Sequence, residues 1–211
     1  MTRIVAGTRG GRRIAAPPGQ GTRPTSDRVR EALFSTLDSL VELAGCRFAD
    51  LYAGSGAVGL EAASRGAEAV LLVEADARAA RTVRDNITAL GLADRCHLLV
   101  ARLPAALAHP PEQPYDVVFA DPPYATSQEE VAAVLRALVT QGWLGPEAVV
   151  VVERSARSPE PPAVPGITAG RGRRYGESVL WYLRAAERVP RAADPVPAAE
   201  AVSTDNERGV R

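Results

Sequence analysis

The stretch DLYAGSGAVGLEAASRG, residues 50–66, decides the fold of this chain. It contains the pattern G-x-G-x-x-G at Gly54, Gly56 and Gly59, which follows an apolar run and precedes residues with helical periodicity. A strand, a glycine turn and a helix in this order are typical of a parallel sheet that binds a nucleotide-like ligand. Glycine suits such a turn because it has no side chain to hold a ligand away from the backbone.

Strands and helices alternate along the rest of the chain. Apolar runs predict strands at 46–51, 69–73, 96–100, 115–119 and 148–153. Helical spacing predicts helices at 23–37, from Leu60 onward, and at 77–90, 103–108 and 129–141. Residues 3–16 are expected to form a β-hairpin, and so are 167–175 with 178–183. We therefore expect an α/β fold with a mostly parallel seven-stranded sheet, an antiparallel C-terminal hairpin and a small N-terminal β-hairpin extension.

Size and composition are those of a soluble globular protein. The 211 residues suffice for one α/β domain, with 46% apolar and 24% charged residues. There is no signal-peptide core and no apolar run of about 18 residues, so we expect a cytoplasmic protein outside the membrane. Cys46 and Cys96 are expected to be free thiols. His97 and His109 lack partners at metal-ligand spacing, so no metal site is expected.

The net charge is zero, but the basic residues are unevenly spread. The first 30 residues hold seven arginines and one aspartate, a balance of +6. All 25 basic residues are arginine, which binds phosphate bidentately and stacks on bases. The N-terminal cluster therefore indicates either a nucleic-acid contact or a solvated, flexible arm.

Two carboxylates flank the glycine turn and indicate which ligand it holds. Asp50 lies four residues before Gly54, where it would repel a pyrophosphate and attract a cationic amine or sulfonium. Glu74 ends the next predicted strand and can accept hydrogen bonds from both hydroxyls of a ribose. The combination favours S-adenosylmethionine over NAD. A plain β-turn-α connection would explain the glycines but not both carboxylates.

The turn FADPPYA, residues 119–125, follows the fourth predicted parallel strand. Two prolines end a strand because each lacks an N–H and has a fixed φ. The carboxyl ends of parallel strands face the ligand crevice, so this turn should meet the glycine turn. Asp121 and the Pro122 carbonyl can accept both hydrogens of a planar amine, while Tyr124 stacks on its ring. A strand stop alone would not explain the flanking acid and aromatic.

Four segments, taken together and in this order, resemble the RsmD family: RIVAGTRGGRRI, GTRPTSDRVREALF, DLYAGSGAVGLEA and VFADPPY. The resemblance covers residues 3–184. It implies a Rossmann-like class I methyltransferase that transfers a methyl group from S-adenosylmethionine to N2 of a guanine in bacterial 16S (small-subunit) ribosomal RNA. The catalytic residues that it implies are Asp121, Pro122, Pro123 and Tyr124. The expected cofactor-binding residues are Asp50, Tyr52, Gly54, Ser55, Gly56, Glu74, Ala75 and Leu103.

One position departs from the pattern of such enzymes. Many of them carry Asp or Asn after the third strand, where it binds the adenine amine, whereas this chain has Ala101 and Arg102. We therefore expect backbone groups and apolar contacts with Ala75 and Leu103 to hold the adenine.

The resemblance gives the N-terminal arginines a role. We expect Arg3, Arg9, Arg12 and Arg13 to contact RNA phosphates, and Arg23, Thr25 and Arg28 to lie nearer the target base. Arg28 could equally form a helix-start ion pair with Glu31. Arg171, Arg173 and Arg174 either extend this surface or form a solvated hairpin tip. The expected division is an RNA-binding extension at 1–22, a methyltransferase domain at 23–184 and a disordered tail at 185–211.

Other functions remain open at this point. A DNA adenine-N6 methyltransferase would use the same proline turn, although no target-recognition domain is visible. A non-catalytic RNA-binding factor in ribosome assembly is the alternative outside enzymes, although Asp50, Glu74 and Asp121 are all present. The expected partner is small-subunit ribosomal RNA, naked or in a partly assembled ribonucleoprotein particle, and the protein is expected to be a monomer.

Overall fold

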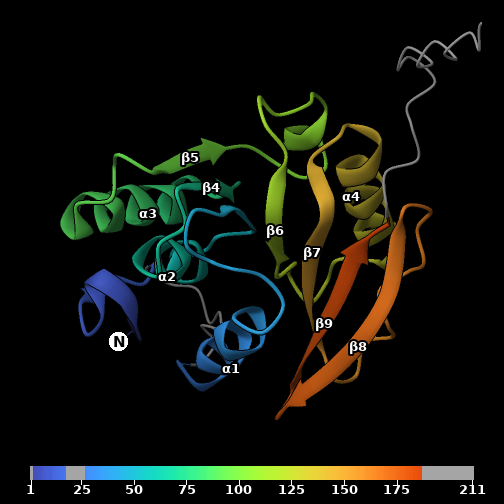
Figure 1. Ribbon diagram of the computed structural model, residues 1–211, viewed down its shortest axis with the longest axis horizontal. Helices are drawn as coiled ribbons and strands as arrows, with labels where there is room; N and C mark the ends of the chain where they lie inside the picture. Colours follow the sequence, from blue (N-terminus) through green and yellow to red (C-terminus); the bar gives the residue numbers. More distant parts are fainter. Residues whose placement is uncertain (1, 18–26, 187–211) are drawn as a thin grey trace, which may run out of the picture.

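The computed structural model describes residues 2–17 and 27–186. Its centre is a seven-stranded sheet with the order β5-β4-β3-β6-β7-β9-β8, shown in Figure 1. The parallel strands are β3 (Arg47–Leu51), β4 (Ala69–Glu74), β5 (Cys96–Val100), β6 (Tyr115–Ala120) and β7 (Leu144–Ser155). β9 (Ser178–Ala185) runs antiparallel to both β7 and β8 (Ile167–Tyr175). The predicted sheet and its C-terminal hairpin are thus confirmed.

Helices cover both faces of the sheet and enclose two separate cores. α1 (Asp27–Leu37), α2 (Ala57–Ser64) and α3 (Ala77–Leu90) pack on one face, around side chains such as Phe34, Leu60 and Val83. α4 (Gln128–Thr140) and the single turn η2 (Ala105–Leu107) pack on the other, around Leu107 and Leu135. In α1, α3 and α4 the apolar stripes that predicted the helices are the surfaces that they bury, whereas every residue of α2 is buried.

Three predicted boundaries were wrong. The helix expected at 103–108 is only the 3₁₀ turn η2, because Pro104 precedes it and Pro110 follows. α2 begins at Ala57 rather than Leu60, since the left-handed Gly56 serves as its N-cap. β7 is longer than the expected 148–153, because an irregularity in its pairing with β6 lets it continue past Pro146.

The last strand is also longer than expected. β9 extends to the buried Ala185, two residues beyond the strand end expected at 183. Ala186 then donates a backbone hydrogen bond to the Gly166 carbonyl at 2.9 Å. The tail expected to be disordered lies, from residue 187 on, outside the described residues.

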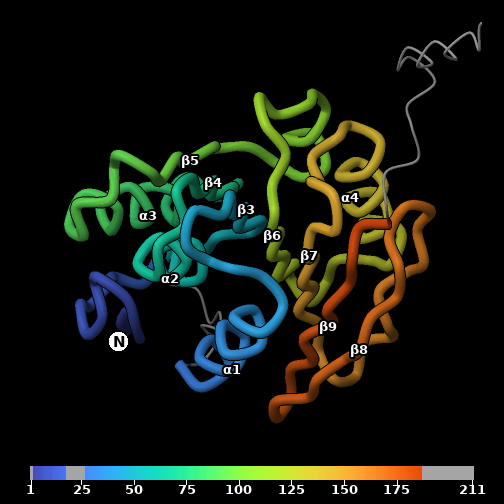
Figure 2. The backbone as a smooth tube through the Cα atoms, in the orientation of Figure 1, coloured from blue at the N-terminus to red at the C-terminus, as the bar shows by residue number. Residues whose placement is uncertain are grey.

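The N-terminal extension is the predicted hairpin, and it packs on the rest of the protein. β1 (Thr2–Arg3) pairs antiparallel with β2 (Arg13–Ile14), and the 3₁₀ turn η1 (Gly7–Arg9) lies between them. Figure 2 shows the extension beside α2 and α3. Ile4 and Ile14 are buried in the core that α2 and α3 share. Gly7 has a φ of 78°, and a Cβ there would lie 2.0 Å from the Ser64 carbonyl oxygen, so only glycine fits this contact.

A buried carboxylate ties the extension to α2. Glu61 has no exposed surface, and its two oxygens accept the backbone N–H groups of Val5 at 2.6 Å and Ala6 at 2.9 Å. Arg65 donates to the same carboxylate at 3.0 Å, and the Nε atom of the fully buried Arg30 lies 3.7 Å away. A buried charge is tolerated only when it is paired and hydrogen-bonded, and both conditions hold for the Glu61 carboxylate.

Replacing this carboxylate by an amide tests its role. We expect Glu61→Gln to lower the free energy of unfolding by about 3 kcal/mol, because it leaves Arg30 and Arg65 without their shared negative partner. Urea denaturation measures the change. The exposed Glu42 provides the control, since Glu42→Gln should change stability by no more than about 0.5 kcal/mol. Equal effects of the two substitutions would contradict the role assigned to Glu61.

Candidate active site

The glycine turn lies at the carboxyl edge of the sheet, between β3 and α2. Gly54 and Gly56 have φ values of 59° and 80°, in the left-handed region that favours glycine. The N–H of Gly54 donates to one oxygen of Glu74 at 2.7 Å, and the N–H of Asp76 donates to the other at 2.8 Å. Glu74 therefore joins the turn to the start of α3, and its half-buried carboxylate keeps lone pairs for further donors.

Asp50 fixes the same turn from beneath. Only 1% of the residue is exposed, and its carboxylate accepts the Gly59 N–H at 2.8 Å. Burial raises the pKa of Asp50 to about 7, an effect that the Gly59 hydrogen bond opposes and the charge of Glu74 reinforces. Asp50 thus holds α2 against β3 from inside the protein, and its expected contact with a cofactor amine stays a prediction.

Asn86 of α3 is a further support that the sequence did not reveal. Its side-chain amide donates to the Ser55 carbonyl at 2.9 Å and to the Ala15 carbonyl at 3.0 Å, and its oxygen accepts the Ala15 N–H at 2.8 Å. It thereby links the glycine turn to the N-terminal extension. An Asn within an amphipathic helix gives no sequence signal for such a contact, because many positions there are polar.

The proline turn lies at the end of β6, beside β3. Asp121 is half-buried, Pro122 is buried, Pro123 is exposed, and Tyr124 exposes 69% of its surface. Thr126 closes the turn by donating its N–H to the Pro123 carbonyl at 2.9 Å. Burial raises the pKa of Asp121 well above its ordinary value, and the negative charges of Glu153 and Asp50 raise it further, against the opposing charge of Arg154.

Asp50, Asp121 and Glu153 form a staggered row of carboxyl groups across three adjacent strands, in which Asp50 lies two residues earlier in register than the other two. Asp50 is paired in register with Phe119, and Phe119 with Val151. Side chains two residues apart on a strand share a face, so Asp121 and Glu153 continue the rows of Phe119 and Val151. That face is the one covered by α1 and α2. Glu153, which is 6% exposed, was not among the predicted site residues, although it too ends a predicted strand.

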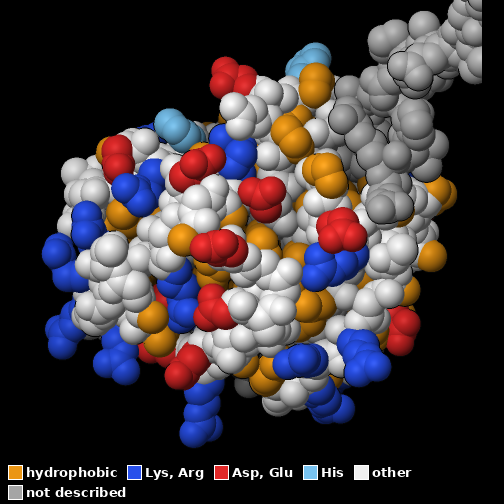
Figure 3. All heavy atoms as spheres, viewed as in Figure 1, with side chains coloured by type: hydrophobic (Ala, Val, Ile, Leu, Met, Phe, Trp, Pro, Cys, Tyr) orange, Lys and Arg blue, Asp and Glu red, His pale blue; other side chains and the backbone are white. Residues whose placement is uncertain are grey.

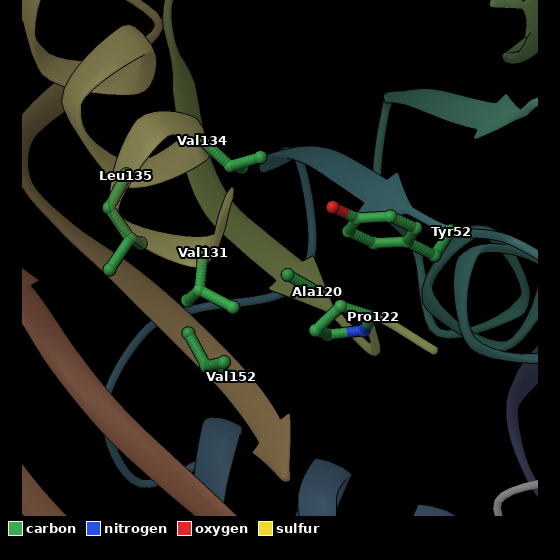
Figure 4. Close-up of a pocket in the computed structure, with 7 residues that line it drawn as sticks. All are labelled: Tyr52, Ala120, Pro122, Val131, Val134, Leu135 and Val152. Atoms are coloured by element: carbon green, nitrogen blue, oxygen red, sulfur yellow. The ribbon is translucent and has the colours of Figure 1, made fainter. Parts of the chain in front are cut away.

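The opposite face of the same edge holds a small apolar cavity, shown in Figure 4. Tyr52, which has a φ of 70°, lines it together with Ala120 and Pro122, opposite side chains of α4 and β7. Arg154 is also buried near this edge and donates to the Thr126 carbonyl at 3.0 Å. Tyr52 and Arg154 therefore support the proline turn from behind, and the assignment of Tyr52 to the cofactor stays a prediction.

The residues expected around the adenine lie next to Glu74. Ala75 is exposed and Leu103 half-buried, and the Ala101 N–H donates to the Glu74 carbonyl at 3.1 Å. The backbone between β5 and η2 is thus held against the end of β4. This arrangement is compatible with an apolar contact surface and leaves the adenine assignment as a prediction.

Two of the expected RNA-binding arginines have structural partners. Arg9 donates through Nε to the Leu90 carbonyl at 2.6 Å, and Arg12 donates to the Ala89 carbonyl at 2.9 Å. These carbonyls belong to the last turn of α3, where positive charge also stabilises the helix dipole. Charge counting alone could not reveal this second role.

The other arginines are more open. Arg3 lies 3.8 Å from Asp27 with two thirds of its side chain exposed, and Arg13 and Arg28 are exposed. Among the described residues, Arg28 makes no ion pair with Glu31, so that alternative is not borne out. The remaining two expected contacts lie outside the described residues: Arg23 and Thr25.

Basic side chains also gather at the far end of the sheet. Arg171, Arg173 and Arg174 are exposed on the edge strand β8, and Figure 3 shows arginines over this end and along the side formed by the extension and α3. Arg173 donates to the Thr36 hydroxyl at 3.2 Å and Arg174 to the Gly176 carbonyl at 3.0 Å. These bonds fix the two side chains without burying them.

Across residues 2–17 and 27–186, no three His, Cys, Asp or Glu side chains gather closely enough to hold a metal ion. None of the helices in these ranges is long and apolar enough to cross a membrane. Both cysteines are buried and free, and burial raises the pKa of each thiol to about 12.

Comparison with known proteins identifies the family. The family described as Conserved hypothetical protein 95 matches residues 2–184. Ribosomal RNA small subunit methyltransferase D of Escherichia coli K12 is 37% identical over 151 residues, which cover 72% of this chain and 73% of the relative. The chain belongs to the RsmD family. The resemblance carried by the four sequence segments is thereby confirmed.

Solved structures agree with the RsmD family assignment. The structure of yhhF from Escherichia coli has a TM-score of 0.75 and 31% identity, and the match covers 89% of this chain and 99% of that one. An RNA methyltransferase from Salinibacter ruber in complex with S-adenosyl-L-homocysteine has a TM-score of 0.56 at 19% identity, covering 82% and 99% of the chains. The expected Rossmann-like class I methyltransferase fold is confirmed.

The buried Asp50 should make stability depend on pH. Its folded-state pKa of about 7 exceeds its ordinary value of 3.8, so the folded state binds the proton more tightly than the unfolded chain. This contribution to stability is full below about pH 4 and is lost as the pH rises through about 7. We expect the free energy of unfolding, relative to that of Asp50→Asn, to fall by about 4 kcal/mol across this range in urea titrations. A difference that stays constant with pH would contradict the burial argument.

Proposed function

We propose that this protein transfers a methyl group from S-adenosylmethionine to the exocyclic N2 of a guanine in small-subunit ribosomal RNA. The observation that carries the proposal is the Asp121–Tyr124 turn at the carboxyl edge of the sheet, beside the glycine turn, in a chain of the RsmD family. The specificity for guanine N2 rests on the family resemblance and on the chemistry of the turn.

The residues around the glycine turn fit the cofactor. When bound, S-adenosylmethionine supplies an electrophilic methyl group on a positively charged sulfur. Each oxygen of Glu74 already accepts one backbone N–H and has a lone pair left for a ribose hydroxyl. Gly54 and Gly56 present bare backbone, and the half-buried carboxyl group of Asp121 suits a cation. Ala75 and Leu103 would provide the apolar contact for the adenine.

The proline turn would hold the target base. Asp121 accepts one N–H of the exocyclic amine and the Pro122 carbonyl the other, while the exposed ring of Tyr124 is free to stack on the base. The two acceptors orient the nitrogen lone pair toward the methyl carbon, so that the N–C bond forms as the S–C bond breaks. The proton that the nitrogen then loses has Asp121 as its nearest acceptor. Much of the rate gain comes from this orientation.

The alternatives are less well supported. A DNA adenine-N6 methyltransferase would share the proline turn, but the relatives of this chain are named for ribosomal RNA. A non-catalytic assembly factor would have no need for Asp50, Glu74 and Asp121 together. Assays with naked small-subunit RNA and with partly assembled particles separate these functions and identify the form of the substrate.

Removal of the Asp121 carboxylate tests the catalytic assignment. We expect Asp121→Ala to lower the rate of labelled methyl transfer to small-subunit RNA by about 100-fold or more, because the amine loses its charged acceptor. Binding of S-adenosylhomocysteine, measured by calorimetry, should persist and show that the variant is folded. Asp94→Ala, at an exposed residue that precedes β5, should retain full activity. Full-rate transfer by the Asp121 variant would refute the assigned site.

We propose that the RNA surface includes three exposed arginines. Arg3 and Arg13 belong to the proposed RNA-binding extension at 1–22, and Arg28 lies near the start of the proposed methyltransferase domain at 23–184. Arg9 and Arg12 would contribute charge while they hold α3. Deleting the extension would also remove the donors to Glu61, so it cannot separate RNA binding from folding. Point substitutions can.

Salt dependence tests this surface. The double variant Arg13→Ala, Arg28→Ala should weaken RNA binding and reduce the slope of log affinity against log salt by about 1 for each arginine–phosphate pair that the substitutions remove. Fluorescence anisotropy over about 50–200 mM salt measures both quantities. Arg136→Ala, on α4 of the opposite face, is the matched control. A slope unchanged from that of the control would exclude these arginines from the RNA surface.

A further inference from the structure

The edge strand β8 carries three exposed arginines, Arg171, Arg173 and Arg174, and no acidic residue. It is the last strand in the sheet order, so one side of its backbone has no partner strand among the described residues. Charged side chains protect such an edge from pairing with another chain, and this role would suit all three arginines equally. The pairing of β8 with β9, however, distributes them unequally between the two faces of the sheet.

A β-bulge decides which face Arg171 occupies. Thr168 pairs with Arg184 and Arg171 with Tyr182, so two residues of β8 lie opposite one residue of β9 between these pairs. One of the two is Gly170, where a Cβ would lie 1.3 Å from the Tyr182 carbonyl oxygen, so only glycine fits there. Directly paired residues share a face of the sheet. Arg171 therefore lies on the face of Tyr182, which is the face that α1 covers.

Arg173 lies on the same face as Arg171, because it is two residues further along the strand. Its Nη1 atom donates to the Thr36 hydroxyl of α1 at 3.2 Å, and its guanidinium carbon lies 5.9 Å from the centre of the Tyr182 ring. These contacts hold the side chain in place while it stays exposed. Arg174, the next residue, belongs to the opposite face. The α1 face of β8 thus carries two arginines and the α4 face one.

The α1 face of β8 continues the row of side chains that includes Asp121. Arg173 pairs with Leu180 of β9, and Leu180 pairs with Glu153 of β7. Glu153 in turn lies at the level of Asp121, which follows the neighbouring strand β6. Adjacent strands lie about 4.8 Å apart, so Arg173 lies about 14 Å across the sheet from Asp121. Phosphates a few nucleotides from a base held at Asp121 would therefore lie over this part of β8.

We propose that Arg171 and Arg173 bind phosphates of the substrate RNA, on the other side of the active site from the N-terminal extension. This inference rests on the proposed function and deepens it by adding a second RNA contact. Arginine binds phosphate through paired hydrogen bonds, and such contacts position a nucleic acid without reading its sequence. Figure 3 shows arginines along the extension and α3 and again at the end formed by β8, with acidic side chains between them. An RNA that spans both ends carries its target base across the carboxyl edge of the sheet.

A second copy of this chain is the other occupant that an edge strand could accept. Pairing of two β8 strands would bring the arginines of both copies together, and like charges opposite each other are destabilising. RNA carries the complementary charge. The retention of two arginines on the face that leads to Asp121 also has no counterpart in a role that only protects the edge, so the surface fits RNA better.

Single substitutions on the two faces of β8 test the inference. Among the described residues, Arg171 makes no side-chain hydrogen bond and no ion pair, so Arg171→Ala should leave the fold intact. We expect it to weaken binding of small-subunit RNA and to lower the slope of log affinity against log salt by about 1. Adding Arg173→Ala should lower the slope by about 1 more. The matched control is Arg174→Ala, which removes the same charge from the opposite face and should keep the wild-type slope.

Fluorescence anisotropy with an RNA that the wild-type protein methylates measures these slopes, and thermal unfolding checks that each variant is folded. A wild-type slope in Arg171→Ala, or equal losses in Arg171→Ala and Arg174→Ala, would overturn the inference. Self-association of Arg171→Ala with unchanged RNA binding would also overturn it and would assign the arginines to protection of the edge. Absence of methyl transfer by the wild-type protein would refute the proposed function, whereas the slopes test the inference separately because they measure binding alone.

Discussion

The hydrogen bonds of the Glu61 carboxylate are the interaction on which the arrangement of this protein depends. α2 is a short helix with every residue buried, so it has no solvent-facing side to set its orientation. Glu61 fixes the orientation of α2. Its carboxylate accepts hydrogen bonds from two backbone N–H groups of the extension and from the Arg65 side chain, and the Arg30 side chain of α1 lies close by. The main effect of such a buried charged group is to specify one arrangement of the extension, α1 and α2, because only one way of packing them satisfies its hydrogen bonds. Its contribution to net stability is smaller. The glycine turn is the start of this helix and is positioned with it.

The chemistry follows from a second constraint, the register of the parallel strands. Register and alternation together place Asp50, Asp121 and Glu153 in one row at the carboxyl edge, although they are far apart in sequence. The residues behind the row, Tyr52 and Arg154, belong to the opposite face and hold the proline turn by packing and by the bond to Thr126. One face therefore carries the three carboxyl groups, while the residues of the other face support the proline turn.

The sequence predicted the strands and helices whose apolar residues recur with a regular period. It did not predict the roles of side chains that depend on an interaction partner distant in the sequence. Apolar spacing located the strands and α3 closely, and the glycine and proline turns were found because their backbone geometry demands those residues. Glu61 was missed because a charged residue in an amphipathic pattern is expected to face water. Arg9 and Arg12 were counted as charge, yet their partners are carbonyls of α3. Glu153 is the last residue of a predicted strand, and Asp50 and Glu74 also lie at or next to predicted strand ends. That Glu153 lies beside Asp121 follows only from the pairing of β6 with β7, which the sequence did not predict.

The separation of charge in this molecule bears on how a substrate would enter. The row of carboxyl groups repels phosphate, and the exposed arginines of the extension, α1 and β8 lie around it on other elements. A polynucleotide would therefore keep its backbone on the arginines, and only a base turned away from that backbone could reach Asp121. The repulsion among the carboxyl groups, which raises the pKa of Asp121, is a cost of the free state that a cation and a donor-rich base would relieve. In the proposed function, the same charges would disfavour the phosphate and favour the base and the cofactor.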